Sequence, residues 1–354
     1  MSEIAITRAT SRKPRPADAD LKFGTVFTDH MFLMEYSEAK GWHDPRIEPY
    51  HPLSLDPAAM VLQYSQTIFE GLKAYRLKSG EVKIFRPAAN AARFERSCVR
   101  MCIPAVDRQM FVQSVKELVK IDAEWTPRSP GTALYIRPTA IASEAALGMR
   151  TAKAYMYYVV LTPVGPLFGI NHKPLKILVA DKYVRSIRGG VGSAKTGGNY
   201  AATLLQTEEA KSAGFDQVLY LDGLKREYVD EFGAMNFMAK IGDEIVTPPL
   251  SDTILAGITR DSVLHLLREW KVKVVERPIS INEMYEAGRS GRLAEVWAVG
   301  TGVGISAIGE LTYRGERLVV SSGETGPTTQ RIYNELNAIR YGESPDPYGW
   351  LEAL

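Results

Sequence analysis

Cysteine is scarce in this sequence, since its 354 residues include only Cys98 and Cys102. The two lie four positions apart, which is not the C-x-x-C spacing typical of redox or zinc sites. So few cysteines are typical of proteins in a reducing cytoplasm, where disulfides rarely form. We therefore expect two half-buried, unpaired thiols, no metal site and a cytoplasmic protein.

The sequence also lacks a strong excess of charge and a long apolar segment. The net charge is +2, and the only basic run is Arg12–Arg15. So small an excess argues against nucleic acid as the main partner, because nucleic-acid-binding proteins concentrate positive charge on one face. The longest uncharged stretch, Tyr155–Ile170, is short for a membrane span and contains two prolines. No apolar block follows the amino terminus, so we expect no signal peptide and no membrane partner.

The remaining composition is that of an ordinary globular protein, with 45% hydrophobic and 24% charged residues. The length suggests two domains. We expect a loose tail over residues 1–20, a small domain over 21–161 and a larger domain over 175–354. Residues 162–174 are dense in proline and glycine and are predicted to form the linker. Strand-like and helix-like segments alternate in both domains, which indicates two α/β domains around a central crevice.

Periodicity predicts the main elements. Apolar residues at helical spacing predict helices over 88–101, 109–125, 201–212 and 259–270. Alternating or short apolar runs predict strands over 81–85, 132–136, 154–161, 175–180, 218–221 and 294–299.

One lysine lies in a glycine-rich segment. Lys195 is surrounded by five glycines within Gly189–Tyr200, and glycine lets the backbone approach a ligand closely. A lysine that forms a Schiff base needs rigid placement and partial burial, which disfavours its charge. A solvated lysine on a flexible surface loop remains an alternative.

Two nucleotide-site patterns are weaker alternatives. Gly189–Thr196 nearly matches a P-loop and Val218–Asp222 resembles a Walker B strand, but Ala194 occupies the second required glycine. The preceding residues 182–188 are a poor buried strand. The G-x-G-x-x-A pattern of Gly302–Ala307 is followed by no helix-like segment, so a dinucleotide site is not expected.

Several longer motifs resemble those of branched-chain aminotransferases, which are fold-type IV pyridoxal-phosphate enzymes. The motifs are Tyr64–Tyr75, Phe85–Pro87, Gly189–Tyr200, Glu231–Asn236, Val246–Leu250 and Gly300–Thr301. They occur in the family's order between Phe23 and Tyr341. The resemblance implies a small N-terminal α/β domain and a larger C-terminal α/β domain built as a pseudo-barrel, which binds the cofactor.

The resemblance also implies roles in holding pyridoxal phosphate. Lys195 matches the lysine that forms the Schiff base and shuttles a proton. Glu231 matches the carboxylate beside the pyridine nitrogen, and Tyr200 the tyrosine that bonds the phenolic oxygen. The phosphate is expected at Arg93, Thr301 and the N–H groups of Ile258 and Thr259. Arg185 aligns near the cofactor without an assigned role. Without the family, Glu231 would be interpreted as a surface acid and Arg93 as an exposed helix residue.

Substrate residues are implied in the same way. The N–H groups of Thr301 and Gly302, with Tyr135, match the site for the α-carboxylate. Arg137 matches the residue that receives the distal carboxylate of glutamate. Three aromatic residues match the pocket around an aliphatic side chain, although core packing is their ordinary role: Phe23, Tyr64 and Phe69. Such a pocket discriminates only modestly among leucine, isoleucine and valine, at about 1 kcal/mol per methylene.

The loop 145–149 resembles one that the neighbouring subunit contributes, which implies a homodimer. The sequence departs from common family members at Ser193, Ala234 and Leu167, which affects the expected substrate range more than the chemistry. Val303 and Ser306 stand where some animal enzymes have a redox C-x-x-C, so no thiol switch is expected there.

These observations predict a pyridoxal-phosphate aminotransferase. It would transfer the amino group of leucine, isoleucine or valine reversibly to 2-oxoglutarate by a ping-pong mechanism. Alternatives with the same fold are a D-amino acid aminotransferase and an aminodeoxychorismate lyase, against which Arg137 and the Tyr64–Tyr75 motif argue. A nucleotide-binding module and a non-catalytic relative are alternatives of other classes.

Overall fold

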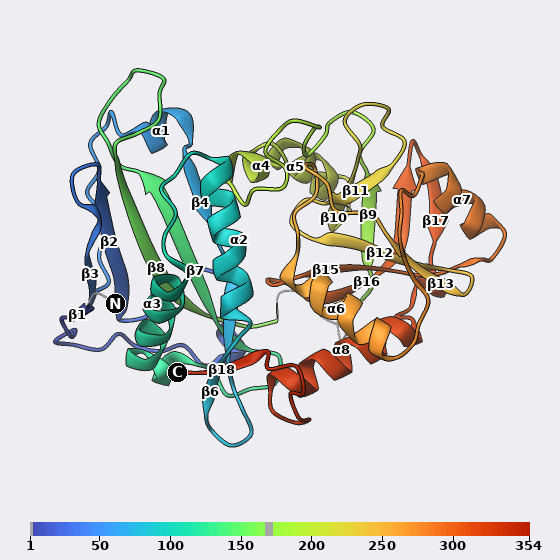
Figure 1. Ribbon diagram of the computed structural model, residues 1–354. Coiled ribbons are helices and arrows are strands. Elements are labelled where there is room, and N and C mark those ends of the chain that lie inside the picture. The colour runs from blue at the N-terminus through green and yellow to red at the C-terminus, as the bar shows by residue number, and fades with distance from the viewer. Residues whose placement is uncertain (1–2, 167–172) are drawn as a thin grey trace. The chain divides into compact units, whose positions relative to one another are not determined.

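The computed structural model describes residues 3–166 and 173–354. The chain forms two compact units (Figure 1). Unit 1 comprises Met1–Leu167, Ala194–Gly197 and Ala338–Leu354, and unit 2 comprises Phe168–Ser193 and Gly198–Asn337. Lys195 therefore belongs to unit 1, although most of its glycine-rich segment belongs to unit 2. The domain bounds expected from the sequence stay a prediction. Part of the predicted linker, residues 167–172, lies outside the described residues, and so does Leu167, one of the departures from family members.

The described part of unit 1 is built on a nine-stranded sheet with the order β1-β3-β2-β8-β7-β5-β6-β18, in which β4 also pairs with β7. The pairs are antiparallel except β1 with β3. The strands are β1 (Ala5–Ile6), β2 (His30–Ser37), β3 (Gly41–Pro49), β4 (Thr67–Phe69), β5 (Leu72–Arg76), β6 (Val82–Phe85), β7 (Ala133–Ala142), β8 (Ala154–Val164) and β18 (Leu351–Ala353).

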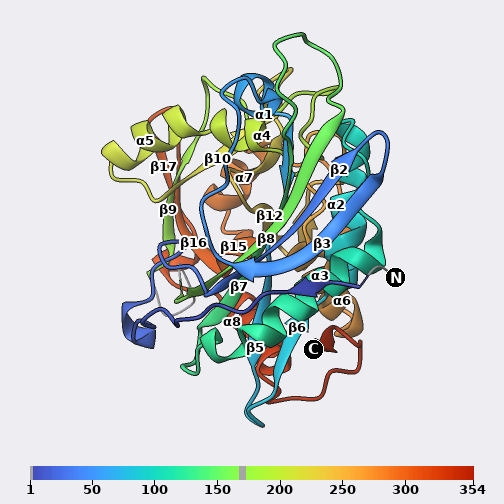
Figure 2. The same cartoon turned by 90° about the vertical axis from the view of Figure 1, so that its left-hand side faces the viewer.

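Two helices cover one face of this sheet, α2 (Pro87–Arg100) and α3 (Arg108–Ile121), and a short helix α1 (Met60–Tyr64) precedes β4 (Figure 2). Successive side chains of a strand point to opposite faces. In β7, Leu134 and Ile136 join Phe94 and Phe111 of the two helices in the core. Tyr135 and Arg137 therefore lie on the opposite face of the sheet.

Residues near the amino terminus pack against unit 1. The backbone N–H of Ala9 donates to His30 Nε2 at 2.9 Å, and that of Lys13 donates to Asp29 Oδ1 at 2.8 Å. Strand β1 pairs with β3 in the same segment. These contacts differ from the loose tail that the polar composition of residues 1–20 led us to expect.

In the described part of unit 2, six strands close into a barrel, in the order β11-β10-β9-β16-β15-β12 with β12 returning to β11. The residues that close the ring are Glu231 and Asn236, which are paired across β11 and β12. Strands β13 and β14 extend the sheet beyond β12, and β17 pairs with β16. The bounds are β9 (Leu175–Val179), β10 (Gln217–Leu221), β11 (Val229–Phe232), β12 (Asn236–Ile241), β13 (Glu244–Thr247), β14 (Val274–Glu276), β15 (Leu293–Gly300), β16 (Gly304–Tyr313) and β17 (Glu316–Val319).

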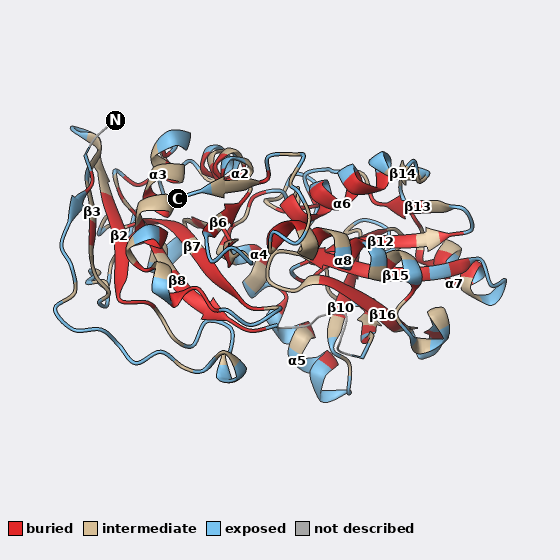
Figure 3. Ribbon diagram, turned by 90° about the horizontal axis from the view of Figure 1, so that it is seen from below, coloured by how far each residue is buried: buried red, intermediate tan, exposed pale blue. Residues whose placement is uncertain are grey.

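Helices surround the barrel strands. They are α5 (Leu204–Ser212), α6 (Ile258–Glu269) and α7 (Ile281–Arg289). Two other helices, α4 (Gly197–Ala201) and α8 (Pro327–Arg340), each include residues of both units. Buried residues are concentrated along the strands of both sheets, for example β7 and β8 in unit 1 and β16 in unit 2 (Figure 3). The α/β fold class predicted from the sequence is confirmed.

The structure also decides between sequence interpretations. Residues 182–188 form no strand, and Gly304–Tyr313 is a strand, so neither nucleotide motif has its required context. Cys98 is buried, Cys102 is exposed, and both are unpaired. Within residues 3–166 and 173–354, no helix has the length and apolar character needed to cross a bilayer.

Candidate functional site

Helix α2 has a row of buried polar residues, here called the polar stripe, which faces the segment between β4 and β5. Asn90, Arg93 and Ser97 are spaced so that they share one face of the helix, and all three are buried. Arg93 was expected to be an exposed residue when read without the family, and that interpretation is wrong because only 3% of it is exposed. The stripe meets Glu70, which has no exposed surface.

Glu70 and Arg93 form a bidentate ion pair. Arg93 Nε donates to Glu70 Oε1 at 2.6 Å and Nη2 to Oε2 at 2.7 Å. Asn90 Nδ2 and the N–H of Gly71 also donate to Oε2, at 2.7 and 3.0 Å. Burial by itself raises the pKa of Glu70, but the charges of Arg93 and Lys195 and these hydrogen bonds outweigh it and leave the pKa below its usual value. Glu70 is therefore an anion fixed in the interior of unit 1.

The backbone around Lys195 is anchored to β4 and α2. The N–H of Lys195 donates to Ser97 Oγ at 3.0 Å, and its carbonyl oxygen accepts from the N–H of Phe69 at 2.9 Å. Thr196 forms a β-bridge with Ile68, and its hydroxyl donates to the carbonyl oxygen of Thr67 at 2.7 Å. The lysine is half-buried, with Nζ 4.9 Å from the centre of the Phe69 ring. The alternative of a solvated lysine on a flexible surface loop does not fit these contacts.

Aromatic and cationic side chains gather on the helix-free face of β7. The rings of Phe23 and Tyr135 lie 4.8 Å apart edge to face. Arg137 Cζ lies 4.6 Å from the centre of the Phe69 ring, and Arg137 Nη2 donates to Tyr135 Oη at 3.1 Å. Arg137 Nε is buried and has no hydrogen-bond partner among the described residues. Such a buried N–H is suited to an anionic ligand, because leaving it unsatisfied is costly.

Gly71 leaves room for this cluster. A Cβ atom at position 71 would lie 2.0 Å from Tyr135 Oη, so any larger residue there would require the Tyr135 ring to move. Tyr64, the third predicted pocket aromatic, is exposed and donates its hydroxyl proton to the carbonyl oxygen of Leu147. The structure therefore links Phe69 and Tyr135 through Arg137, places Phe23 against Tyr135, and ties Tyr64 to the loop 145–149.

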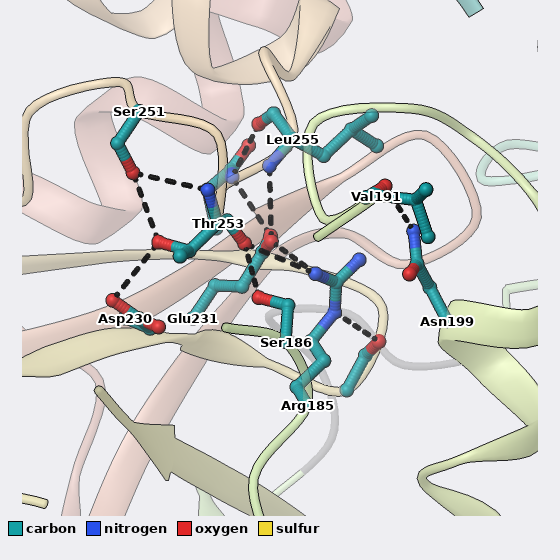
Figure 4. A network of polar contacts seen from close by, with 11 residues as sticks. Arg185, Ser186, Val191, Asn199, Asp230, Glu231, Ser251, Thr253 and Leu255 are labelled. Carbon is teal, nitrogen blue, oxygen red and sulfur yellow. Dashed lines mark hydrogen bonds and ion pairs between the residues drawn. The ribbon is translucent and has the colours of Figure 1, made fainter. Parts of the chain in front are cut away.

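Unit 2 holds Glu231 where the barrel closes (Figure 4). Glu231 is 2% exposed, so the surface position inferred without the family is wrong. Arg185 Nη1 lies 2.8 Å from Glu231 Oε1, which also accepts from the N–H of Leu255 at 3.0 Å. Asn236 Nδ2 donates to Oε2 at 3.1 Å. The carboxylate is thus oriented by a cation, a backbone N–H and a side-chain amide.

The neighbouring acid, Asp230, has a different environment. Burial, then the charges of Glu231 and Asp222, raise the pKa of Asp230 to about 7. The hydroxyl of Thr253 donates to its Oδ1 at 3.4 Å. The charge of Arg185 lowers the pKa of Asp230 too, but it does not outweigh burial, and the ion pair of Arg185 is with Glu231.

The start of α6 presents backbone N–H groups. Gly257 is the N-cap without a side-chain hydrogen bond, and Ile258 and Thr259 are buried in the first turn. A Cβ atom at Gly257 would lie 1.9 Å from Asn236 Oδ1, so the glycine allows Asn236 to reach Glu231. The N-terminus of a helix favours anions.

The other predicted residues of unit 2 are partly exposed. Thr301 and Gly302 lie in the turn between β15 and β16, and Tyr200 lies in α4. Arg185 Cζ is 5.9 Å from the centre of the Tyr200 ring. Two of the departures from family members, Ser193 and Ala234, are exposed.

Sequence reasoning assigned no role to Glu70, Asn90 or Ser97. The sequence does contain a signal for a buried Glu70, since this acid interrupts an apolar run between Ile68 and Leu72. The polar stripe likewise repeats along a helix whose adjacent face is apolar. These patterns indicate buried polar groups that must find partners.

Comparisons with known proteins identify the family of the chain. Residues 67–311 match the family model described as amino-transferase class IV. The chain is 46% identical over 347 residues to branched-chain-amino-acid aminotransferase 2 of Bacillus subtilis, covering 98% of this chain and 96% of that protein. It is 44% identical over 333 residues to a probable branched-chain-amino-acid aminotransferase of Streptomyces coelicolor, covering 94% and 92%.

Solved structures show the same fold. The branched-chain amino acid aminotransferase from Escherichia coli matches with a TM-score of 0.73 at 22% identity, covering 91% of this chain and 98% of that one. The holo-form of the Thermobaculum terrenum enzyme with pyridoxal phosphate matches with a TM-score of 0.72 at 23% identity, covering 91% and 97%. From the match to the class IV model and the identity to its relatives, the chain belongs to the branched-chain aminotransferases of the class IV aminotransferase family.

Proposed function

We propose that the protein uses pyridoxal phosphate to transfer the amino group of L-leucine, L-isoleucine or L-valine reversibly to 2-oxoglutarate, giving the branched 2-oxo acid and L-glutamate. The single observation that carries this proposal is the anchoring of Lys195. Its N–H and carbonyl are both hydrogen-bonded, to Ser97 and Phe69, so the amine extends from a fixed backbone position. A lysine that bonds covalently to a cofactor requires such placement.

The described residues offer the groups that pyridoxal phosphate needs. Glu231 is a buried anion suited to a protonated pyridine nitrogen, and the first turn of α6 offers N–H groups to a phosphate. Arg93 and Thr301 complete the proposed phosphate ligands, and Tyr200 is proposed to bond the phenolic oxygen. When bound, the cofactor supplies an electron sink that stabilises negative charge at the substrate's Cα.

The side chains then have separable tasks. Lys195 would hold the cofactor between turnovers, and its released amine would take the proton from the substrate's Cα and deliver it to the cofactor's C4′ atom. Glu231 keeps a proton on the pyridine nitrogen because Arg185 and the N–H of Leu255 stabilise its charge. Glu70 fixes the Arg93 guanidinium through two hydrogen bonds, which leaves its orientation independent of ligand.

We assign the substrate to groups on the helix-free face of β7 and the turn after β15. Tyr135 with the N–H groups of Thr301 and Gly302 binds the α-carboxylate. Arg137 receives the distal carboxylate of glutamate, which is supported by its buried, unsatisfied Nε. Phe23 and Phe69, with Tyr64, enclose the aliphatic side chain of the amino acid. The proposed residues of unit 1 thus offer aromatic rings to an apolar side chain and Arg137 to a carboxylate.

The two half-reactions provide the test. L-leucine should bleach the visible absorbance of the bound cofactor, and 2-oxoglutarate should restore it. Arg137→Gln should slow the second step much more than the first, since only 2-oxoglutarate carries the distal carboxylate. Arg46→Gln, which removes an ion pair with Glu35 in β2, is the matched control in the same sheet. Bleaching by D-alanine and not by L-leucine would instead support a D-amino acid aminotransferase.

We further propose a cytoplasmic homodimer in which the loop 145–149 contributes to the neighbouring site. Leu147 is 66% and Met149 87% exposed, and exposed apolar side chains of this size are suited to an interface. The two unpaired cysteines are compatible with the cytoplasm. Sedimentation analysis of the wild type against Leu147→Asp/Met149→Asp should show a dimer that the variant weakens; a monomeric wild type would contradict this.

A further inference from the structure

We propose that Arg185 is a positioning residue for the reaction, which orients the carboxylate of Glu231 and the ring of Tyr200 together. The inference deepens the proposed function, since it rests on Glu231 and Tyr200 holding pyridoxal phosphate. Both contacts of Arg185 lie within unit 2. Its Nη1 is 2.8 Å from Glu231 Oε1 (Figure 4). Its Cζ is 5.9 Å from the centre of the Tyr200 ring.

Arg185 is itself held in place by the backbone. Its Nε donates to the carbonyl oxygen of Gly233 at 3.2 Å, and Nη1 donates to that of Thr253 at 3.4 Å. The hydroxyl of Ser186 donates to the same Thr253 oxygen at 2.7 Å. Gly233 lies in the turn that closes the barrel, and Thr253 lies in the segment before α6. The guanidinium therefore links the barrel closure to the segment that leads to α6.

Arg185 forms its ion pair with only one of two adjacent acids, although its charge also lowers the pKa of the other, Asp230. Asp230 and Glu231 are consecutive in β11, so their side chains point to opposite faces. Arg185 forms its ion pair with Glu231, and both side chains are 2% exposed. A buried ion pair stabilises the charged form of an acid only when its hydrogen bonds are well placed. Here Leu255 and Asn236 supply further donors to the same carboxylate.

Arg277 provides the comparison, because it also belongs to unit 2 and pairs with two glutamates, Glu283 at 2.6 Å and Glu244 at 3.2 Å. None of these three residues is proposed to hold the cofactor. Loss of Arg277 should therefore affect folding alone, whereas loss of Arg185 should affect the cofactor as well.

The test measures binding of pyridoxal phosphate to the apo protein by equilibrium dialysis. Arg185→Gln should weaken binding roughly 10- to 100-fold, the range for loss of a hydrogen bond to a charged group. Arg185→Lys, which keeps the charge, should recover part of the affinity. Arg277→Gln should leave the affinity unchanged.

A double-mutant cycle separates action through Glu231 from a general loss of structure. With Glu231→Gln already present, Arg185→Gln should weaken binding clearly less than it does in the wild type, because the partner charge is gone and only the contact with the Tyr200 ring is lost. An equal loss in both backgrounds, or wild-type affinity in Arg185→Gln, would overturn the proposal. A wild-type protein that binds no pyridoxal phosphate would instead overturn the proposed function.

Discussion

Replacing Glu70 by glutamine should strongly destabilise unit 1. The substitution preserves the shape of the side chain but leaves Arg93 without its bidentate carboxylate, in a place where Glu70 has no exposed surface and Arg93 is 3% exposed. Removing one member of a buried ion pair costs about 3–5 kcal/mol, because the remaining charge is buried without compensation. The glutamine oxygen can still accept one hydrogen bond, so we expect the lower end, about 3 kcal/mol.

The effect should depend on pH with a defined sign. The pKa of Glu70 lies below its usual value, so its stabilisation is complete above the unfolded pKa, near 4.3. It is lost as the pH falls through the folded pKa, where the wild type is also protonated. The difference in free energy of unfolding between wild type and Glu70→Gln should therefore shrink in acid.

The assay is urea unfolding at several pH values, combined with hydrogen exchange of the α2 amides. Glu316→Gln is the control, because its pair with Arg289 is at least half exposed and should contribute less than about 1 kcal/mol. The double variant Glu70→Leu/Arg93→Met should recover much of the stability, since both charges are gone. A Glu70→Gln protein within about 1 kcal/mol of wild type at neutral pH would refute the reasoning.

Two further predictions concern unit 2. Gly257→Ala should weaken binding of pyridoxal phosphate, measured by dialysis, because the new Cβ would lie 1.9 Å from Asn236 Oδ1 and displace the amide from Glu231; unchanged affinity would show that Asn236 does not matter. Asp230→Asn should remove a pH dependence of stability. The pKa of Asp230 is raised to about 7, so between about pH 4 and 7 the folded protein holds a proton that the unfolded chain releases, and the contribution of Asp230 to stability decreases at about 1.4 kcal/mol per pH unit. Equal pH slopes for both proteins in urea unfolding would contradict this.

The sequence predicted a helix well where the spacing of apolar residues agrees with a residue typical of a helix start. The helix expected over 88–101 is α2, Pro87–Arg100, and the one expected over 259–270 is α6, Ile258–Glu269. Proline at N1 and glycine at the N-cap mark these starts. The helix expected over 201–212 is shorter, Leu204–Ser212, because α4 ends separately at Ala201. Residues 202–203 form a turn between the two helices, which the sequence pattern did not indicate.

The ion pairs of the site could not be predicted from local sequence patterns. Glu70 meets Arg93 across 23 positions, and Arg185 meets Glu231 across 46, so no periodicity connects them. Closure of the barrel through Glu231 and Asn236 also depends on tertiary pairing. The packing of residues 3–15 on β3 and His30 was missed for the same reason, because the segment is polar and its only strand has two residues.

The central claim is that Lys195 carries the cofactor, and peptide mapping tests it most directly. Unit 1 contains a competing amine, since burial and the nearby Arg340 lower the pKa of Lys73 to about 7. The protein loaded with pyridoxal phosphate is treated with borohydride, digested, and searched for the lysine that bears the reduced cofactor. The account predicts the modification at Lys195 and none in Lys195→Ala; a modification at Lys73, or at no lysine, would contradict it.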